Sequence, residues 1–287
     1  MRCARPTLIA FLVAACQTGG TTPTASSQAG IATAGSSASA APAPTARPDV
    51  STAPPLASVT GDYEVAPDGR TLHMTCLGAG SPTVLLEGGH PGSGLADFLR
   101  YGRVFTTLLA AERRVCTYDR AGYPGSDPAP NEPRDLEDVT DDLHALLEAA
   151  EIEGPLVLAG SSFGGFIVTY YAHRFPEGIE GVVLLDAPRP SATLTLEVAP
   201  ELAWDHSTNP EHLDVVPEFE NRLANERFPF EAPLLVITAT DGGSTMAEHA
   251  FWLDWSESSE HVSIEGGHEV YIDSPEEVRD AILEIAP

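Results

Sequence analysis

The sequence predicts an α/β fold in which a mostly parallel sheet is covered by helices on both faces. From about residue 60 onward, short apolar segments alternate with longer amphipathic ones, a pattern typical of βα units. One apolar segment, residues 156–159, passes through Gly160-Ser161-Ser162-Phe163-Gly164 into an amphipathic run at 166–175. A proline-rich stretch, residues 187–231, interrupts the alternation.

The individual elements follow from their local patterns. The first two strands flank Ala66-Pro67-Asp68-Gly69, a composition suited to a hairpin turn. Short apolar runs predict strands and longer runs with helical periodicity predict helices. The expected strands are 63–65, 72–76, 84–87, 115–119, 156–159, 181–185, 234–238 and 261–264, and the expected helices are 95–111, 136–150, 166–175, 246–253 and 275–285.

Residues 187–231 are longer than a usual connection between a strand and a helix. Long connections inside a compact domain are usually functional, so we predict a small lid over an active site. Four aromatic side chains in it either line an apolar substrate pocket or pack the lid onto the domain. They are Trp204, Phe219, Phe228 and Phe230.

The turn around Ser162 fits the G-x-S-x-G pattern of a nucleophilic serine between a strand and a helix. Such a turn strains the serine backbone and brings the residues two before and two after it together, which explains Gly160 and Gly164. It also aims the hydroxyl at a helix N-terminus, where the Phe163 N–H would stabilise a developing oxyanion.

A nucleophilic serine needs a general base, and the base needs an orienting carboxylate. His268 follows the last expected strand, and Asp241 follows the strand before it. The carboxyl ends of parallel strands share one edge of a sheet, so we predict Ser162, Asp241 and His268 as a catalytic triad. Asp186, one strand earlier, is the alternative acid.

A second oxyanion donor is expected in the glycine-rich turn Glu87-Gly88-Gly89-His90-Pro91-Gly92, which follows the strand at 84–87. This turn exposes the amides of Gly89 and His90, and we predict Gly89 as the donor. A glycine-rich turn without a catalytic part is the alternative.

From about Tyr63 onward the chain resembles the α/β-hydrolase superfamily. The matching segments, in order, are 82–89, Tyr118-Asp119-Arg120-Ala121-Gly122-Tyr123, the serine turn, 183–186 and Gly267-His268. The resemblance implies an eight-stranded sheet and hydrolysis of an ester or similar acyl bond without metal or cofactor. Many relatives begin the oxyanion loop with His-Gly, where this chain has Glu87-Gly88.

Composition excludes several other mechanisms. The formal net charge is -27, so a nucleic acid would be repelled. The sequence contains no lysine, which excludes a Walker A loop, a pyridoxal Schiff base and a Ser-x-x-Lys nucleophile. The expected partner is a small acyl substrate, and we expect a monomer.

The N-terminus predicts export. Residues 1–15 combine two arginines with a short apolar run, and 13–16 resemble a lipobox in which Cys16 is lipidated. Residues 16–58, rich in Ala, Thr, Ser and Pro, predict a disordered linker. The hydrolase domain is therefore expected at 59–287, attached to the bacterial envelope by lipid alone, in the periplasm or at the cell surface.

Two questions stay open at this level. Cys76 and Cys116 lie on strands that are neighbours in the resembled fold, so they form either a disulfide or two buried thiols. The lid sets the substrate, so peptidase, thioesterase and carbon–carbon hydrolase activities are alternatives to esterase activity. A catalytically inactive surface-anchored binding protein is the alternative from another class.

Overall fold

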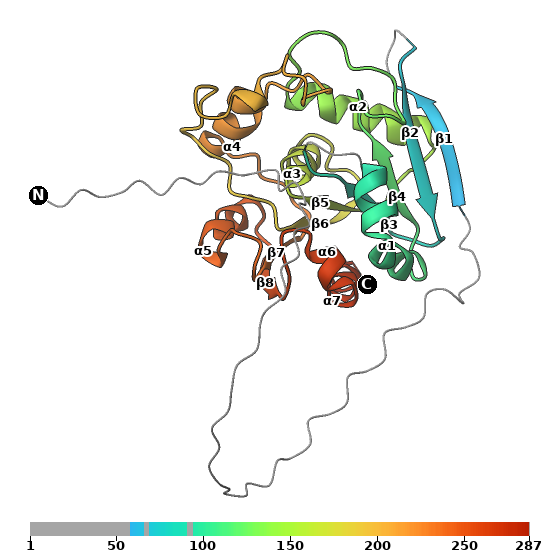
Figure 1. Ribbon diagram of the computed structural model, residues 1–287. Coiled ribbons are helices and arrows are strands. Elements are labelled where there is room, and N and C mark those ends of the chain that lie inside the picture. The colour runs from blue at the N-terminus through green and yellow to red at the C-terminus, as the bar shows by residue number, and fades with distance from the viewer. Residues whose placement is uncertain (1–57, 66–68, 91–93, 287) are drawn as a thin grey trace, which may run out of the picture. The chain divides into compact units, whose positions relative to one another are not determined.

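A computed structural model describes residues 58–65, 69–90 and 94–286 (Figure 1). The predicted signal peptide, Cys16 and all of the predicted linker except Ser58 lie outside the described residues and stay predictions. Within the described ranges, no helix combines the length and apolar character needed to cross a bilayer.

The eight-stranded sheet expected from the family resemblance is confirmed, with strand order β1-β2-β4-β3-β5-β6-β7-β8. β2 pairs antiparallel with β1 and β4, and the neighbouring pairs from β4 to β8 are parallel. The strands are β1 (Ser58–Glu64), β2 (Thr71–Leu77), β3 (Thr83–Glu87), β4 (Val115–Asp119), β5 (Leu156–Ser161), β6 (Ile179–Leu185), β7 (Leu234–Ala239) and β8 (Ser259–Ile264).

Helices cover both faces of this sheet (Figure 1). α2 (Leu136–Ala149) and α3 (Gly164–Arg174) bury their apolar side chains in one core, and α1 (Arg103–Ala110) and α7 (Pro275–Ile285) bury theirs in the other. The strands between the two cores are apolar on both sides, as a covered parallel sheet requires. The other described helices outside the connection between β6 and β7 are η2 (Leu95–Tyr101), α5 (Met246–His249), η5 (Ala250–Trp255) and α6 (Val270–Asp273).

The segment between β6 and β7, which contains the predicted lid, carries three short helices: η3 (Pro200–Leu202), η4 (Val215–Asn221) and α4 (Arg222–Asn225). We call residues 187–231 the lid segment. Phe219 is fully buried, and its ring centroid lies 4.9 Å from that of Phe163, beside the serine turn. Phe228 packs on Tyr170 of α3. These two aromatic side chains therefore hold the lid segment against the domain.

The helix expected at 95–111 is broken at Gly102, between η2 and α1. A β-carbon at Gly102 would lie 2.8 Å from the ring of Tyr271, which belongs to α6. The break therefore reflects close packing with a distant segment, which helical periodicity cannot reveal. α6 itself was not expected, because four residues are too few for a periodic signal.

Cys76 of β2 and Cys116 of β4 face each other in the antiparallel pair and form a disulfide. Both residues lie in the core, at 5% and 0% exposure. The structure thus adopts the first of the two alternatives for these cysteines.

Candidate active site

Ser162 lies in a sharp turn between β5 and α3, and two glycines permit this turn. A β-carbon at Gly160 would lie 2.5 Å from backbone atoms of Gly164. A β-carbon at Gly164 would lie 2.6 Å from the carbonyl oxygens of Glu87 and Gly88. Both distances are far inside contact, so any larger residue would open the turn. The steric reason inferred from the sequence is therefore observed for Gly160, whereas Gly164 is required by the end of β3.

The backbone of Ser162 has φ = 53°, a left-handed conformation that is uncommon for a residue other than glycine. Its N–H donates to the Leu185 carbonyl at 3.0 Å, which ties the turn to the end of β6. Phe163 directly precedes α3, so its N–H is among the first-turn amides without an intrahelical partner. An anion at the Ser162 side chain would meet these amides.

Asp186 and His268 form a hydrogen-bonded pair next to this turn. Asp186 directly follows β6, has φ = 50°, and is 1% exposed. His268 lies in the loop between β8 and α6, and its Nδ1 lies 2.7 Å from Asp186 Oδ2. The other carboxylate oxygen accepts the Ala239 N–H at 3.0 Å. The aspartate is thus fixed by the backbone on one side and presents an oxygen to the imidazole on the other.

The hydrogen bond to Asp186 raises the pKa of His268 above its usual value, against the opposite effect of burial. The side chain of His268 remains 33% exposed, and its second ring nitrogen makes no hydrogen bond among the described residues. No hydrogen bond joins the Ser162 hydroxyl to the His268 ring in the described structure, and contacts of this kind often tighten only in the substrate complex.

The predicted pairing of His268 with Asp241 differs from this geometry. Asp241 is exposed, and its backbone N–H donates to the Gly266 carbonyl at 2.8 Å. The carboxylate that meets the imidazole belongs to the alternative, Asp186. Asp186 is buried beneath the turn that contains Asp241, whereas the Asp241 side chain lies on the outside of that turn. The packing is close, because a β-carbon on Gly242 would lie 2.2 Å from Asp186 Oδ2.

The loop after β3 lies against the nucleophile turn, because a β-carbon on Gly89 would be 3.5 Å from the Ser162 β-carbon. The Gly89 N–H, however, already donates to Asp97 Oδ2 at 3.2 Å. Burial raises the pKa of Asp97, and the Gly89 hydrogen bond opposes this effect. The prediction of Gly89 as oxyanion donor therefore needs revision, and the neighbouring amide, that of His90, is the candidate that remains in this turn.

Sequence reasoning missed three side chains that surround this loop. Asp97 belongs to η2, Arg120 directly follows β4, and Glu211 belongs to the lid segment. Arg120 lies within the Tyr118–Tyr123 segment that matched the family, so a signal existed for it. The other two carry no local signal, because their role arises from contacts with distant residues.

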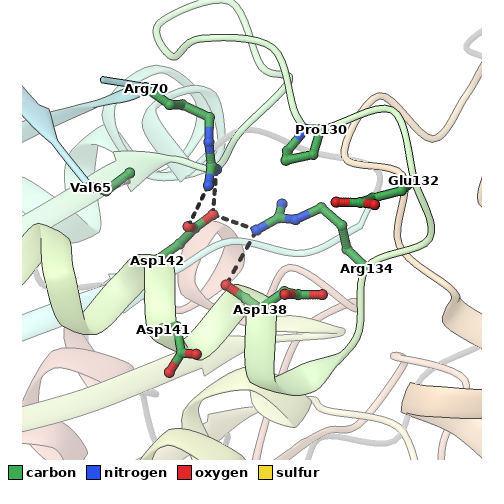
Figure 2. A pocket seen from close by; sticks show the side chains of 8 residues that line it. All are labelled: Val65, Arg70, Pro130, Glu132, Arg134, Asp138, Asp141 and Asp142. Atoms are coloured by element: carbon green, nitrogen blue, oxygen red, sulfur yellow. Dashed lines mark hydrogen bonds and ion pairs between the residues drawn. The ribbon is translucent and has the colours of Figure 1, made fainter. Parts of the chain in front are cut away.

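A cavity of about 190 Å³ lies elsewhere on the domain (Figure 2). Arg70 and Arg134 converge there on Asp142, and their guanidinium groups donate to its carboxylate. The ion pairs satisfy Asp142, and no predicted site residue lines this cavity. Its walls are Val65, Arg70, Pro130, Glu132, Arg134, Asp138, Asp141 and Asp142.

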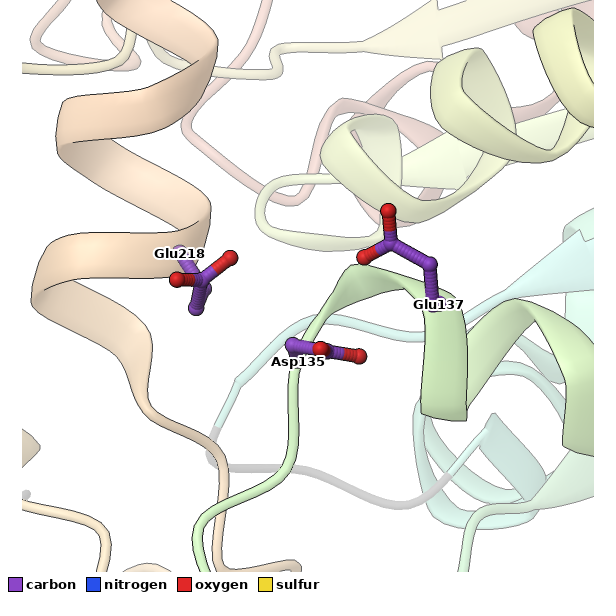
Figure 3. Close-up of side chains that lie close together, drawn as sticks. All are labelled: Asp135, Glu137 and Glu218. Atoms are coloured by element: carbon purple, nitrogen blue, oxygen red, sulfur yellow. The ribbon is translucent and has the colours of Figure 1, made fainter.

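Three carboxylates, those of Asp135, Glu137 and Glu218, lie close enough together to suggest a metal site (Figure 3). Arg222 already provides the positive charge, since it donates to both oxygens of Glu137 at 2.8 Å and to Glu218 at 3.2 Å. Hydrogen bonds from Arg222 lower the pKa of Glu137 to about 2. We therefore assign the cluster to attachment of the lid segment to α2 and propose no metal there.

Comparison with family models gives a match to the alpha/beta hydrolase fold over residues 82–235, more than half of the chain. Among curated proteins, a putative non-heme chloroperoxidase of Synechocystis is 35% identical over 45% of this chain and 45% of its own. The 2-hydroxy-6-oxo-2,4-heptadienoate hydrolase of Pseudomonas putida is 32% identical over 44% of this chain and 45% of its own. The chain thus spans less than half the length of these relatives.

Solved structures agree with this fold over a larger share of the chain. An esterase from Thermogutta terrifontis has a TM-score of 0.62 at 20% identity, covering 79% of this chain and 97% of its own. The enol-lactonase of Burkholderia xenovorans has a TM-score of 0.63 at 18% identity, covering 78% and 99%. At these identities the likeness concerns the fold alone.

Proposed function

The chain belongs to the α/β-hydrolase family, and from this premise we propose that it is a serine hydrolase that cleaves an ester or related acyl bond. The observation that carries the proposal is the 2.7 Å pairing of His268 Nδ1 with the buried Asp186, at the strand end beside the Ser162 turn. Asp186 follows Leu185, whose carbonyl accepts the Ser162 N–H, so the nucleophile and the acid occupy neighbouring strand ends.

In the proposed mechanism, the Ser162 oxygen attacks the substrate carbonyl while the free nitrogen of His268, Nε2, takes the hydroxyl proton. Asp186 accepts from Nδ1–H, which fixes the tautomer and stabilises the imidazolium. The protonated His268 then gives its proton to the leaving alcohol. Water, deprotonated by the same imidazole, hydrolyses the acyl-enzyme and regenerates the serine.

The oxyanion of each tetrahedral intermediate is expected to accept from two backbone amides. One is the Phe163 N–H at the start of α3. For the second we propose His90, because the Gly89 N–H donates to Asp97. His90 is adjacent along the loop, and its ring centroid lies 5.2 Å from that of Phe163.

The experiment that tests the proposal is covalent labelling with a fluorophosphonate probe. Attack by the Ser162 oxygen on phosphorus would expel fluoride and leave one phosphonyl group on the serine. Digestion and mass spectrometry should locate the label on the peptide that contains Ser162. An unlabelled protein would favour the inactive binding protein, and a label on another serine would refute the site.

A pH dependence follows from the His268–Asp186 pair. His268 must be neutral to act as a base, and its pKa is raised chiefly by the hydrogen bond to Asp186. We therefore expect kcat/KM for a p-nitrophenyl ester to fall as the pH drops through a value above 6.5 and to level off above it. In Asp186→Asn the pKa of His268 loses this increase, so the fall of the residual kcat/KM on the acid side should move to a lower pH. An acid limb that does not move in this variant would contradict the pairing.

A second candidate is hydrolysis of a carbon–carbon bond. Two relatives favour it by name, the heptadienoate hydrolase and a 2-hydroxymuconate semialdehyde hydrolase of Pseudomonas, which is 32% identical over 46% of this chain and 45% of its own. Parallel turnover measurements on short p-nitrophenyl esters, an acyl thioester, an aminoacyl amide and a vinylogous 1,5-diketone would separate these activities. The preferred substrate is the one with the highest kcat/KM that also depends on Ser162.

For location we keep the proposal of an exported protein anchored by lipid at Cys16. Metabolic labelling with palmitate should disappear in Cys16→Ser, and labelling that persists would refute the anchor.

A further inference from the structure

Arg120 plays no part in the mechanism above, yet it lies between the oxyanion loop and the lid segment. We define the oxyanion loop as residues 87–90. We propose that Arg120 is a positioning residue that fixes the orientation of the Gly89–His90 peptide, and that Glu211 of the lid segment holds Arg120 in place. The inference rests on the proposed function, since it assigns a task to residues around the same oxyanion site.

The guanidinium of Arg120 donates three hydrogen bonds to the oxyanion loop. Nη1 lies 2.5 Å from Glu87 Oε1 and 2.9 Å from the Gly88 carbonyl oxygen, and Nη2 lies 2.6 Å from the Gly89 carbonyl oxygen. Arg120 is 3% exposed, so these bonds form away from water, where they are stronger. Two consecutive carbonyl groups are thereby directed at one side chain.

The orientation of one amide follows from this arrangement. A trans peptide is planar, and its C=O and N–H point in opposite directions. Because the Gly89 carbonyl faces Arg120, the N–H of the same peptide, which belongs to His90, faces away from Arg120. Asp97 accepts the Gly89 N–H from another direction and restrains the preceding peptide as well.

The loop needs this external restraint because of its glycines. Gly88 and Gly89 have no β-carbon to restrict their dihedral angles, so peptides next to them rotate readily. A rotated Gly89–His90 peptide would present its carbonyl oxygen where the N–H is needed. Repulsion between that oxygen and a developing oxyanion would then replace stabilisation.

Glu211 connects the arginine to the lid segment. Its two carboxylate oxygens lie 2.6 Å from Arg120 Nε and 3.0 Å from Nη2, and one of them lies 3.3 Å from His90 Nδ1. Glu211 is fully buried, which alone would favour its neutral form, yet the charge of Arg120 lowers the pKa of Glu211 to about 2. The side chain is therefore a carboxylate, and the lid segment contributes it to both the arginine and His90.

The shape of the arginine matters as well as its charge. A guanidinium has five N–H donors in a rigid plane, and Arg120 uses them on two carboxylates and two carbonyls. A lysine would carry the same charge with at most three donors on a flexible chain. Arg120→Lys thus keeps the charge and removes the geometry.

The test compares Arg120→Lys and Glu211→Gln with a matched control, Arg134→Lys. Arg134 is also 3% exposed and ion-paired, but with Asp142, away from the oxyanion loop. The readouts are kcat and KM for a p-nitrophenyl ester, the affinity of a trifluoromethyl ketone as transition-state analogue, and the melting temperature. The reference is the wild-type chain. If its esterase activity does not depend on Ser162, the proposed function fails; if it does and the Arg120 and Glu211 variants keep the wild-type kcat, only this inference fails.

We expect Arg120→Lys to lower kcat about 10²-fold, comparable to loss of one oxyanion donor, with KM within about threefold. Binding of the ketone should weaken by a similar factor. Glu211→Gln, which keeps the shape of the side chain, should lower kcat about tenfold, and it carries the test if Arg120→Lys does not fold. The control should keep kcat within about twofold.

Two results would overturn the inference. One is an unchanged kcat in folded Arg120→Lys or, if that variant does not fold, in Glu211→Gln. The other is an equal loss of kcat in Arg134→Lys, because the effect would then be that of disturbing any buried ion pair.

Discussion

Ser162→Ala is expected to lower kcat for a short p-nitrophenyl ester by roughly 10⁵- to 10⁶-fold, the scale on which loss of a catalytic serine acts in serine hydrolases. The physical reason is that no acyl-enzyme can form without the serine oxygen. Only direct attack of water on the substrate remains, assisted by the backbone amides of the proposed oxyanion site. The melting temperature should change little, because alanine adds no atoms to a turn that tolerates a β-carbon at this position. Steady-state kinetics and circular dichroism measure the two effects.

Ser161→Ala is the matched control for this variant. Ser161 is the last residue of β5, directly next to the nucleophile, and is 4% exposed. It should retain kcat within about threefold, since no reacting atom touches it. If Ser162→Ala were as active as the wild type, the assignment of Ser162 as the nucleophile would be refuted, regardless of the activity of Ser161→Ala.

Asp186→Asn is expected to lower kcat about 10⁴-fold, because the amide NH2 would face Nδ1 of His268 and donate to it, which stabilises the wrong tautomer of the imidazole. The amide oxygen can still accept the Ala239 N–H, so the backbone around the site should remain in place. The measurement is kcat with the melting temperature as a check on folding.

Asp241→Asn provides the control and tests the other acid directly. Asp241 is exposed, and the Gly266 contact involves its backbone. We expect kcat within about twofold of the wild type. A larger loss in Asp241→Asn than in Asp186→Asn would reverse the assignment of the acid.

The sequence left the choice between these two aspartates open for a geometric reason. Both follow the carboxyl end of a strand, and β6 and β7 are neighbours in the sheet. Asp241 follows the expected strand directly before that of His268 and Asp186 follows the one before that, so both fit the order serine, acid, histidine along the chain. The structure pairs His268 with Asp186 because the loop after β8 reaches over the β7 turn to a carboxylate buried below it.

The serine turn shows the opposite case. Gly160, Ser162 and Gly164 lie within five residues, and the close backbone approach that requires Gly160 occurs inside that short segment, whereas Gly164 is required by the carbonyl groups of Glu87 and Gly88 at the end of β3. All eight strands were predicted, because short apolar runs identify strands without knowledge of their neighbours. The bounds of β1 were not, since this strand was expected at 63–65 and spans Ser58–Glu64. Gly102 marks the limit of this reasoning, since its role depends on the ring of Tyr271.

The amino-acid sequence by itself determined the α/β alternation, the serine turn, the histidine after the last strand and the pair of candidate acids. These properties are local, because each depends on a few consecutive residues and the backbone geometry that they favour. Only the tertiary structure decided which carboxylate meets His268, which amide of the oxyanion loop is already engaged, and that Glu211 of the lid segment holds Arg120. Those decisions depend on side chains up to 91 residues apart, and their meeting depends on how the whole sheet and its connections pack.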